Sequence, residues 1–162
     1  MAIGSNLRDR FANLKSARAR LTELQEIQAP IRSSFIYETD PVGCERGAPT
    51  FFNAVVEFDY DASPLSLLRQ LREIEEALGR PGKHPRNVSR LIDLDILYFA
   101  DQIVNTGELQ LPHSRMTERR FVLEPLADIR PDLILPKQTE TVAVLLARLP
   151  ASPSVNRTAE QW

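Results

Sequence analysis

The feature that most restricts the fold of this chain is a pair of acidic residues inside an apolar run. Residues 91–99 read Leu-Ile-Asp-Leu-Asp-Ile-Leu-Tyr-Phe, which is typical of a buried strand except at Asp93 and Asp95. Because side chains alternate between the two faces of a strand, both carboxylates lie on one face, with their Cα atoms roughly 7 Å apart. Unpaired carboxylates are costly to bury, so this face must meet a cleft, a cation or arginine side chains.

A basic stretch lies directly before the acid pair. Residues 80–90 contain Arg80, Lys83, Arg86 and Arg90, together with two prolines, one glycine and no apolar periodicity. This composition predicts a mobile surface loop. Mg²⁺ prefers carboxylate oxygens, and guanidinium groups bind phosphate. The sequence therefore predicts acids that hold Mg²⁺ beside a loop that holds phosphates.

Size and charge limit the classes of partner. The 162 residues fit one domain, which we expect over residues 1–150, followed by a polar, loosely ordered tail over 151–162. A net charge of −2 gives no general attraction to nucleic acid or anionic membranes, so we expect small-molecule substrates and a monomer. One cysteine, Cys44, excludes an internal disulfide framework, and no apolar run approaches the roughly 20 residues of a membrane span. We expect a cytoplasmic protein.

Strand and helix patterns alternate along the chain. Ser5 or Asn6 is a candidate N-cap for a first amphipathic helix, and Ser63 and Gly79 bracket a second one. The run 51–60 alternates as a half-buried antiparallel strand does. The other predicted elements are a helix over 7–24, a strand over 33–38, a loop over 39–50, a small meander over 103–111, one or two short helices over 116–129 broken by Pro125, and a helix over 141–149.

This order of elements predicts an α+β fold. The expected core is a ferredoxin-like βαββαβ arrangement, in which one largely antiparallel sheet has helices packed on it. Two features of the pattern indicate function. The loop over 39–50 is long for a connection, as substrate-binding loops often are. Glu75 falls on the apolar seam of the second helix, four residues after Leu71, so its carboxylate points inward and needs a partner.

Several short motifs follow one another in a characteristic order and spacing. They are Gly4-Ser5-Asn6, Thr39 to Gly43, Phe51-Phe52-Asn53, Glu75 to Arg80, Arg90 to Asp95, and Leu111-Pro112-His113 with Met116, Arg119 and Phe121-Val122-Leu123. Together they resemble the 6-hydroxymethyl-7,8-dihydropterin pyrophosphokinase family over residues 3–136. This family acts in folate biosynthesis, where it transfers a pyrophosphoryl group from ATP to a pterin alcohol and releases AMP. Each motif alone is a weak signal, and their joint order is a strong one.

The resemblance implies a role for each matching residue. It implies two Mg²⁺ ions on Asp93 and Asp95, ATP as co-substrate, and in-line attack of the pterin hydroxymethyl oxygen on the β-phosphorus. By the same resemblance, the catalytic residues are Arg80, Arg90 and Asp95, the pterin contacts are Thr39, Val42, Asn53 and Phe121, and the ATP contacts are Glu75, Arg80, Arg90, His113 and Arg119. The first strand is shorter than is usual in the family. Where some members have a further loop arginine, Lys83 or Arg86 can substitute.

Two other classes of protein fit parts of the pattern. Ferredoxin-like sheets also serve as RNA-recognition platforms, although the exposed aromatic and basic strand signature of those modules is absent. An Asp-x-Asp pair also occurs in Mg²⁺-dependent nucleotidyl and glycosyl transferases. The products formed from ATP and a dihydropterin alcohol separate these three readings.

Overall fold

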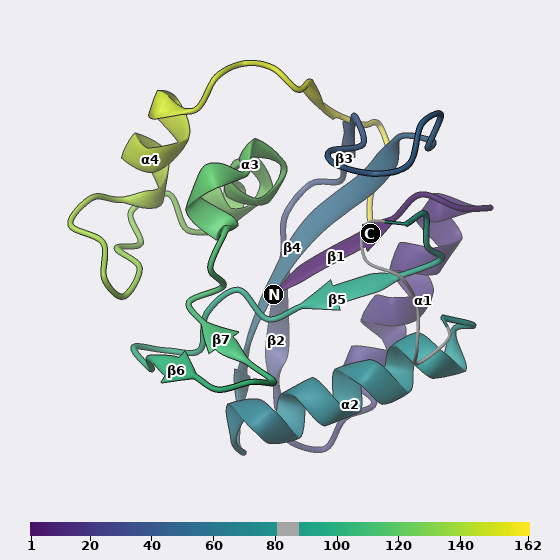
Figure 1. Cartoon of the computed structure of the whole chain (residues 1–162). Coiled ribbons are helices and arrows are strands. Elements are labelled where there is room, and N and C mark those ends of the chain that lie inside the picture. Colours follow the sequence, from purple (N-terminus) through teal and green to yellow (C-terminus); the bar gives the residue numbers. More distant parts are fainter. Residues whose placement is uncertain (81–87) are drawn as a thin grey trace.

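One antiparallel sheet organises the molecule (Figure 1). The computed structural model describes residues 1–80 and 88–162. Neighbouring strands lie in the order β5-β1-β4-β3-β8, and β2 pairs with β4. Since β2 and β3 together stand where a ferredoxin-like fold has one second strand, the predicted fold class is confirmed. The strands are β1 (Ala2–Ser5), β2 (Ile27–Ser33), β3 (Tyr37–Thr39), β4 (Phe51–Tyr60), β5 (Asp93–Asp95) and β8 (Val155–Arg157).

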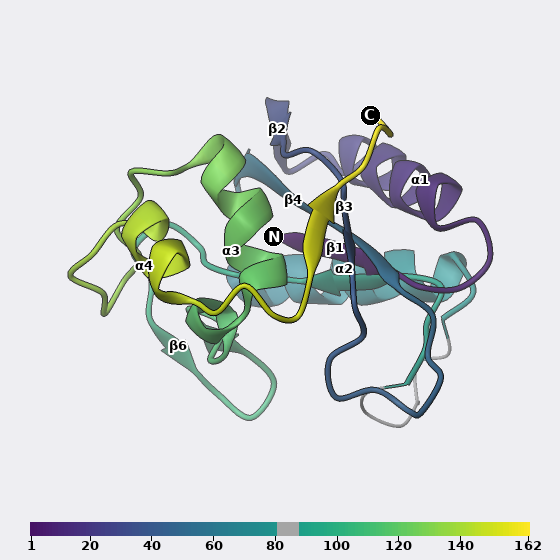
Figure 2. The same ribbon diagram turned by 90° about the horizontal axis from the view of Figure 1, so that it is seen from above.

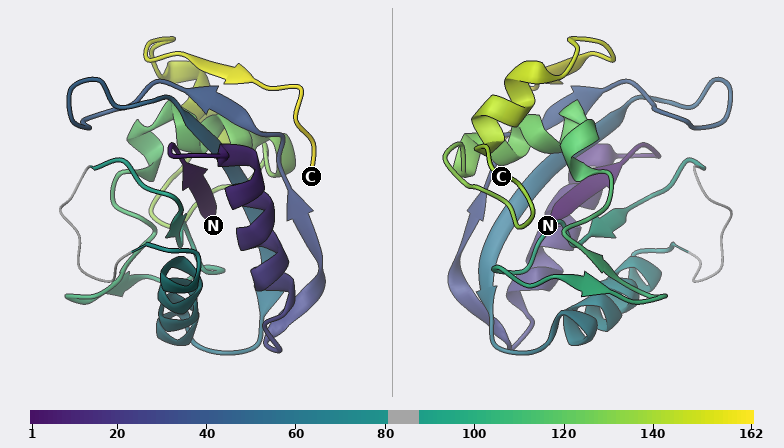
Figure 3. Two further views of the ribbon diagram at one scale, coloured as in Figure 1. Left: turned by 90° about the vertical axis from the view of Figure 1, so that its right-hand side faces the viewer. Right: turned by 60° about the vertical axis from the view of Figure 1, so that its left-hand side comes forward.

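Helices cover both faces of this sheet. On one face, α1 (Arg10–Thr22) and α2 (Pro64–Ala77) lie side by side (Figure 3), and on the other lie α3 (Arg120–Ile129) and α4 (Val142–Arg148). Each face has its own apolar core, and β4 contributes Val56 to the first core and Val55 to the second. The prediction of a half-buried β4 is therefore wrong for the middle of the strand.

The start of the chain differs from the prediction. Ser5 is the last residue of the four-residue strand β1, and the N-cap of α1 is Asp9, whose carboxylate accepts a hydrogen bond from the Ala12 N–H at 2.9 Å. Ser5 and Asn6 are both buried, because pairing of β1 between β4 and β5 draws them into the sheet. The caps predicted for α2 are confirmed: Ser63 is the N-cap, its hydroxyl accepts from the Ser66 N–H, and Gly79 lies after the helix at φ +91°, a conformation that favours glycine.

Two segments, one that follows Pro30 and one that contains Pro125, also depart from the prediction. Residues 33–38 do not form one strand, since β2 ends at Ser33 and β3 begins at Tyr37. The sequence pattern missed β2 because Pro30 interrupts it. Pro125 does not break α3, since this helix buries Val122, Leu123 and Leu126 in the second core, and that packing outweighs one lost backbone hydrogen bond.

The second half of the chain completes the fold. The predicted meander is present as the paired strands β6 (Val104–Asn105) and β7 (Gln110–Leu111), which precede a short 3-10 helix over Met116–Glu118. Residues 151–162, expected as a loosely ordered tail, include β8, which runs beside β3 (Figure 2). In the described part of the chain, every helix is too short or too polar to cross a bilayer. Lys83 and Arg86 lie outside the described residues.

Candidate active site

Three neighbouring strands place Asp93, the first residue of the acid pair, in one row with Asn53. In the sheet register, Gly4 of β1 lies between Asp93 of β5 and Asn53 of β4. A Cβ atom added to Gly4 would lie 2.8 Å from Asn53 Oδ1 and 3.9 Å from Asp93 Cβ. Because Gly4 has no side chain, the Asn53 amide can lie flat across β1 toward the acids.

One pocket gathers all the predicted site residues except Glu75 and Arg80. Its walls come from the loop after β3, from strands β4 and β5, and from the segment that leads into α3. The predicted residues that line it are Thr39, Val42, Asn53, Arg90, Asp93, Asp95, His113, Arg119 and Phe121.

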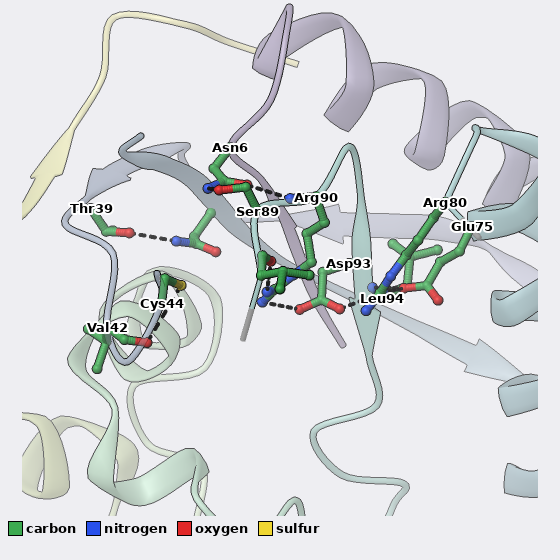
Figure 4. Close-up of polar contacts among 12 residues, drawn as sticks. Asn6, Thr39, Val42, Cys44, Glu75, Arg80, Ser89, Arg90, Asp93 and Leu94 are labelled. Atoms are coloured by element: carbon green, nitrogen blue, oxygen red, sulfur yellow. Dashed lines mark hydrogen bonds and ion pairs between the residues drawn. The ribbon is translucent and has the colours of Figure 1, made fainter. Parts of the chain in front are cut away.

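Glu75 and Arg80 are not among the residues that line this pocket. They belong to an ion network centred on Asp93 (Figure 4). Arg80 Nη1 lies 2.6 Å from Asp93 Oδ1, and Arg90 Nη2 lies 2.6 Å from Asp93 Oδ2. Glu75 Oε1 accepts hydrogen bonds from Arg80 Nη1 and, at 2.7 Å, from the Leu94 N–H. The inward direction predicted for Glu75 is thus confirmed, and its partner is an arginine.

The two arginines keep unused donors. Among the described residues, the buried Nε–H groups of Arg80 and Arg90 have no hydrogen-bond partner. A buried donor without an acceptor costs free energy, and an anion that reached these donors would remove that cost. Guanidinium groups bind phosphate oxygens in pairs, so these donors suit a phosphorylated ligand.

The pKa values of Asp95 and Glu75 are raised above the usual carboxyl range. Burial, and then the neighbouring charge of Asp93, raise the pKa of Asp95 from 3.8 to about 6. Burial likewise raises the pKa of Glu75 to about 7, against the opposing effect of Arg80. Carboxylates that resist ionisation in this way are stabilised by an added cation.

The carboxylates of Asp93 and Asp95 are suitable ligands for Mg²⁺. Within residues 1–80 and 88–162, no group of three or more candidate metal ligands occurs. Mg²⁺ does not need one, because it commonly binds through one or two carboxylates and takes its other ligands from water and substrate phosphates. Asp93 and Asp95 supply such carboxylates on one strand face, beside arginines that can hold the phosphates.

The other end of the pocket suits a flat heterocycle. Asn53 Nδ2 donates to Thr39 Oγ1 at 2.7 Å, which orients the amide and leaves its oxygen and second N–H for a ligand. Phe121 and the 51% exposed Val42 supply apolar surface beside it. The Arg119 guanidinium lies 5.4 Å from the centre of the Phe121 ring.

Two functional positions were missed as such by the sequence analysis. The sequence predicts that Gly4 and Asn6 belong to a turn, but Gly4 lines the pocket and Asn6 connects the two loops beside it. Asn6 Oδ1 accepts from the Arg90 N–H at 2.7 Å, and its Nδ2 donates to Ser89 Oγ at 2.9 Å and to the Pro49 carbonyl at 3.3 Å. No local signal separates such a bridging asparagine from a helix cap.

The model of the family described as 7,8-dihydro-6-hydroxymethylpterin-pyrophosphokinase (HPPK) matches residues 1–131. The chain belongs to this family. Among its relatives, the 2-amino-4-hydroxy-6-hydroxymethyldihydropteridine pyrophosphokinase of Bacillus subtilis is 44% identical over 129 residues, 80% of this chain and 75% of that protein. The enzyme of the same name from Pseudomonas aeruginosa is 39% identical over 136 residues, 84% of this chain and 82% of that protein.

Other HPPK relatives are much longer than this chain. The Folic acid synthesis protein FOL1 of Dictyostelium discoideum is 36% identical over 96% of this chain, which spans only 23% of that protein. A crystal structure of Plasmodium falciparum HPPK-DHPS matches 90% of this chain and 43% of its own, with a TM-score of 0.71 and 17% identity. That structure supports the fold alone.

Gly4→Ala is expected to weaken pterin binding. The added Cβ would lie 2.8 Å from Asn53 Oδ1, so the amide must turn away from the ligand. Loss of a well-placed hydrogen bond corresponds to about a tenfold rise in the pterin KM, with the ATP KM unchanged. Gly107→Ala is the matched control, because nothing lies within 4 Å of its added Cβ. Equal KM values for the two variants would contradict the role of Gly4.

Asp95→Asn is expected to stabilise the metal-free protein at alkaline pH. The folded chain holds the Asp95 proton up to about pH 6 and the unfolded chain only to about 3.8, so the stability of the wild-type protein falls as the pH rises between these values. The asparagine variant avoids this loss, worth up to about 3 kcal/mol. Thermal unfolding in EDTA should show a higher Tm for the variant at pH 8 and equal Tm values at pH 4. A similar shift at both pH values would contradict the raised pKa.

Proposed function

We propose that this chain transfers the pyrophosphoryl group of ATP to the hydroxymethyl oxygen of 6-hydroxymethyl-7,8-dihydropterin and releases AMP. The observation that carries this proposal is the row of Asp93, Gly4 and Asn53 on three adjacent strands. The row joins a site suited to metal and phosphate to a site suited to a flat heterocycle within one pocket. Membership of the HPPK family supports the same reaction.

Asn53 reads the edge of the pterin ring. Thr39 takes one amide N–H, so the Asn53 oxygen and the remaining N–H face the donors and acceptors of the aminopyrimidinone. Phe121 covers one face of the ring, and Val42 closes the pocket from the loop after β3. These contacts direct the hydroxymethyl group toward β5.

Arg80 and Arg90 bind the transferred phosphates. In the structure both contact Asp93, so phosphate binding exchanges a carboxylate partner for phosphate oxygens. It also engages the Nε–H groups of both arginines, which are unpaired within residues 1–80 and 88–162. Asp93 and Asp95 would hold Mg²⁺, for which we propose two ions, and the metal would neutralise charge on the triphosphate. Glu75 keeps Arg80 in place through the exchange.

The reaction is an in-line displacement. A bond forms between the pterin hydroxymethyl oxygen and the β-phosphorus, the bond from that phosphorus to the oxygen it shares with the α-phosphorus breaks, and the hydroxyl proton is lost. His113 and Arg119 line the same pocket, and by the resemblance to the family we assign them to the nucleotide. Burial, followed by the charges of Arg119 and Arg115, lowers the pKa of His113, so its imidazole is neutral at pH 7.

The substrates of this reaction are two small molecules, and neither nucleic acid nor a membrane takes part. The net charge of −2 supports this, because it provides no general attraction to polyanions. We propose that the protein acts as a monomer in the cytoplasm.

The products formed from ATP test this function. The protein is incubated with ATP, Mg²⁺ and 6-hydroxymethyl-7,8-dihydropterin, and the nucleotides are separated by chromatography. The expected result is AMP in equal amount to the pterin consumed, with none formed when pterin is omitted or EDTA is added. ADP would indicate transfer of a single phosphoryl group, free pyrophosphate would indicate a nucleotidyl transferase, and either result would contradict the proposal.

A further inference from the structure

We infer that the C-terminal segment, residues 154–162, positions the pterin-binding end of the pocket. This inference rests on the proposed function, and it concerns a part of the chain beyond residues 1–131, which the HPPK family model matches. The segment lines none of the pocket itself. It acts through β3 and through the first residue of the loop after β3.

The backbone of β8 fixes the position of β3. The two strands pair antiparallel, with Tyr37 opposite Arg157 and Thr39 opposite Val155. Beyond the strand ends, the Thr158 N–H donates to the Ile36 carbonyl at 2.9 Å. Without β8, the three residues of β3 would form an exposed edge held by β4 alone, and such short edge strands are mobile.

Thr39 links the position of β3 to the side-chain amide of Asn53, which we propose binds the pterin. Its side chain is 2% exposed, and its Oγ1 accepts the hydrogen bond from Asn53 Nδ2 at 2.7 Å. The backbone of Thr39 lies between β4 and β8, so pairing on both sides determines where Oγ1 lies. Asn53 therefore presents a fixed pattern of donor and acceptor to the pterin.

Ser154 binds Asp40, the first residue of the loop after β3. Its Oγ–H donates to Asp40 Oδ2 at 2.8 Å and its N–H to the same oxygen at 3.2 Å. In return, the Asp40 N–H donates to the Ser154 carbonyl at 3.4 Å. Asp40 lines the pocket and lies two residues before Val42, so these bonds set the direction in which the loop leaves the sheet.

The far end of the segment is anchored to the body of the protein. Trp162 Nε1–H donates to the Ser34 carbonyl at 2.7 Å, and the Arg18 guanidinium of α1 lies 5.4 Å from the centre of its indole ring. Trp162 also packs against the core between α1, α2 and the sheet. The segment is thus held at both ends, which allows it to act as a support for β3.

Two single hydrogen bonds, one inside this segment and one outside it, provide the test. Ser154→Ala removes the hydroxyl that binds Asp40 beside the pocket. Thr22→Val is the matched control, because it removes a hydroxyl that donates to the Ala19 carbonyl at 2.6 Å on α1, away from the segment and the pocket. We expect Ser154→Ala to raise the pterin KM and the pterin dissociation constant about fivefold, with the ATP KM unchanged. Thr22→Val should leave both substrates unaffected, and Ser154→Thr, which keeps the hydroxyl, should retain wild-type values.

Other outcomes distinguish failure of this inference from failure of the proposed function. Equal effects of Ser154→Ala and Thr22→Val, or equal changes in the KM of both substrates, would reduce the segment to a structural role and overturn the inference. An active wild-type protein with an unaffected Ser154→Ala variant would overturn it as well. A wild-type protein that neither binds the pterin nor forms AMP would contradict the proposed function itself.

Discussion

Asp95→Ala is expected to lower kcat/KM by at least about 1,000-fold, the largest effect that the account predicts. The carboxylates of Asp93 and Asp95 lie on the same face of the three-residue strand β5. The variant keeps one of these two carboxylates, and one carboxylate binds Mg²⁺ much more weakly than two. The fold should remain intact, because the ionised form of Asp95 is already disfavoured by burial. Steady-state AMP formation and thermal unfolding measure the two quantities.

Asp101→Ala is the matched control for this variant. Asp101 is an exposed acid six residues further along the chain, outside the pocket. It should retain wild-type activity and stability. If Asp95→Ala kept more than about a tenth of the wild-type kcat/KM, the assignment of the acid pair to Mg²⁺ would be wrong.

Arg90→Ala is expected to lower kcat about 100-fold or more. The Arg90 guanidinium lines the pocket between Asp93 and the ring of Phe51, from which its centre is 5.1 Å away, and its Nε–H is unpaired among the described residues. Charge-stabilising groups on transferred phosphates contribute most in the transition state, so kcat should fall more than the ATP KM rises. Arg90→Lys should be intermediate, because lysine keeps the charge and loses the paired donors.

Arg72→Ala provides the comparison for Arg90→Ala. The Arg72 side chain is 53% exposed on α2 and lies 3.8 Å from Glu108, so its loss should change neither kcat nor KM. A rise in the ATP KM alone after Arg90→Ala would show that this arginine binds ground-state nucleotide without acting on the transferred group. That outcome would remove it from the catalytic residues.

The acid pair could be predicted from the sequence because it depends on local periodicity. Strand geometry alone puts Asp93 and Asp95 on one face, and helix geometry alone turns Glu75 inward. The pairing of both arginines with Asp93 in this structure was not predictable, since Arg80 and Arg90 lie 13 and 3 residues away along the chain. Whether they contact carboxylate or phosphate depends on what occupies the pocket.

Gly4 and Asn6 show where local patterns fail. A Gly-Ser-Asn sequence before an amphipathic helix has the signature of a turn with an N-cap. Here these residues belong to β1 and its end, because pairing with β4 and β5 buries them and Asp9 takes the cap instead. Only the order of strands in the sheet shows that Gly4 lies between Asn53 and Asp93.

Short strands with long-range partners were the least predictable part of the fold. The three residues of β8 are polar in part, and they pair with β3 more than 100 residues earlier. Strand pairing of this kind comes from contacts across the fold and leaves little trace in composition. The same applies to β2, which pairs with β4 around an irregularity between Gln28 and Arg32.

A single-turnover experiment tests the central claim that one pocket joins the two substrates for one-step pyrophosphoryl transfer. Protein in excess over 6-hydroxymethyl-7,8-dihydropterin is mixed with ATP and Mg²⁺, quenched at intervals, and analysed by mass spectrometry. We expect the pterin to gain two phosphoryl groups together, with AMP appearing at the same rate and no pterin monophosphate at any time. A pterin monophosphate that forms first, or ADP that appears before AMP, would contradict it.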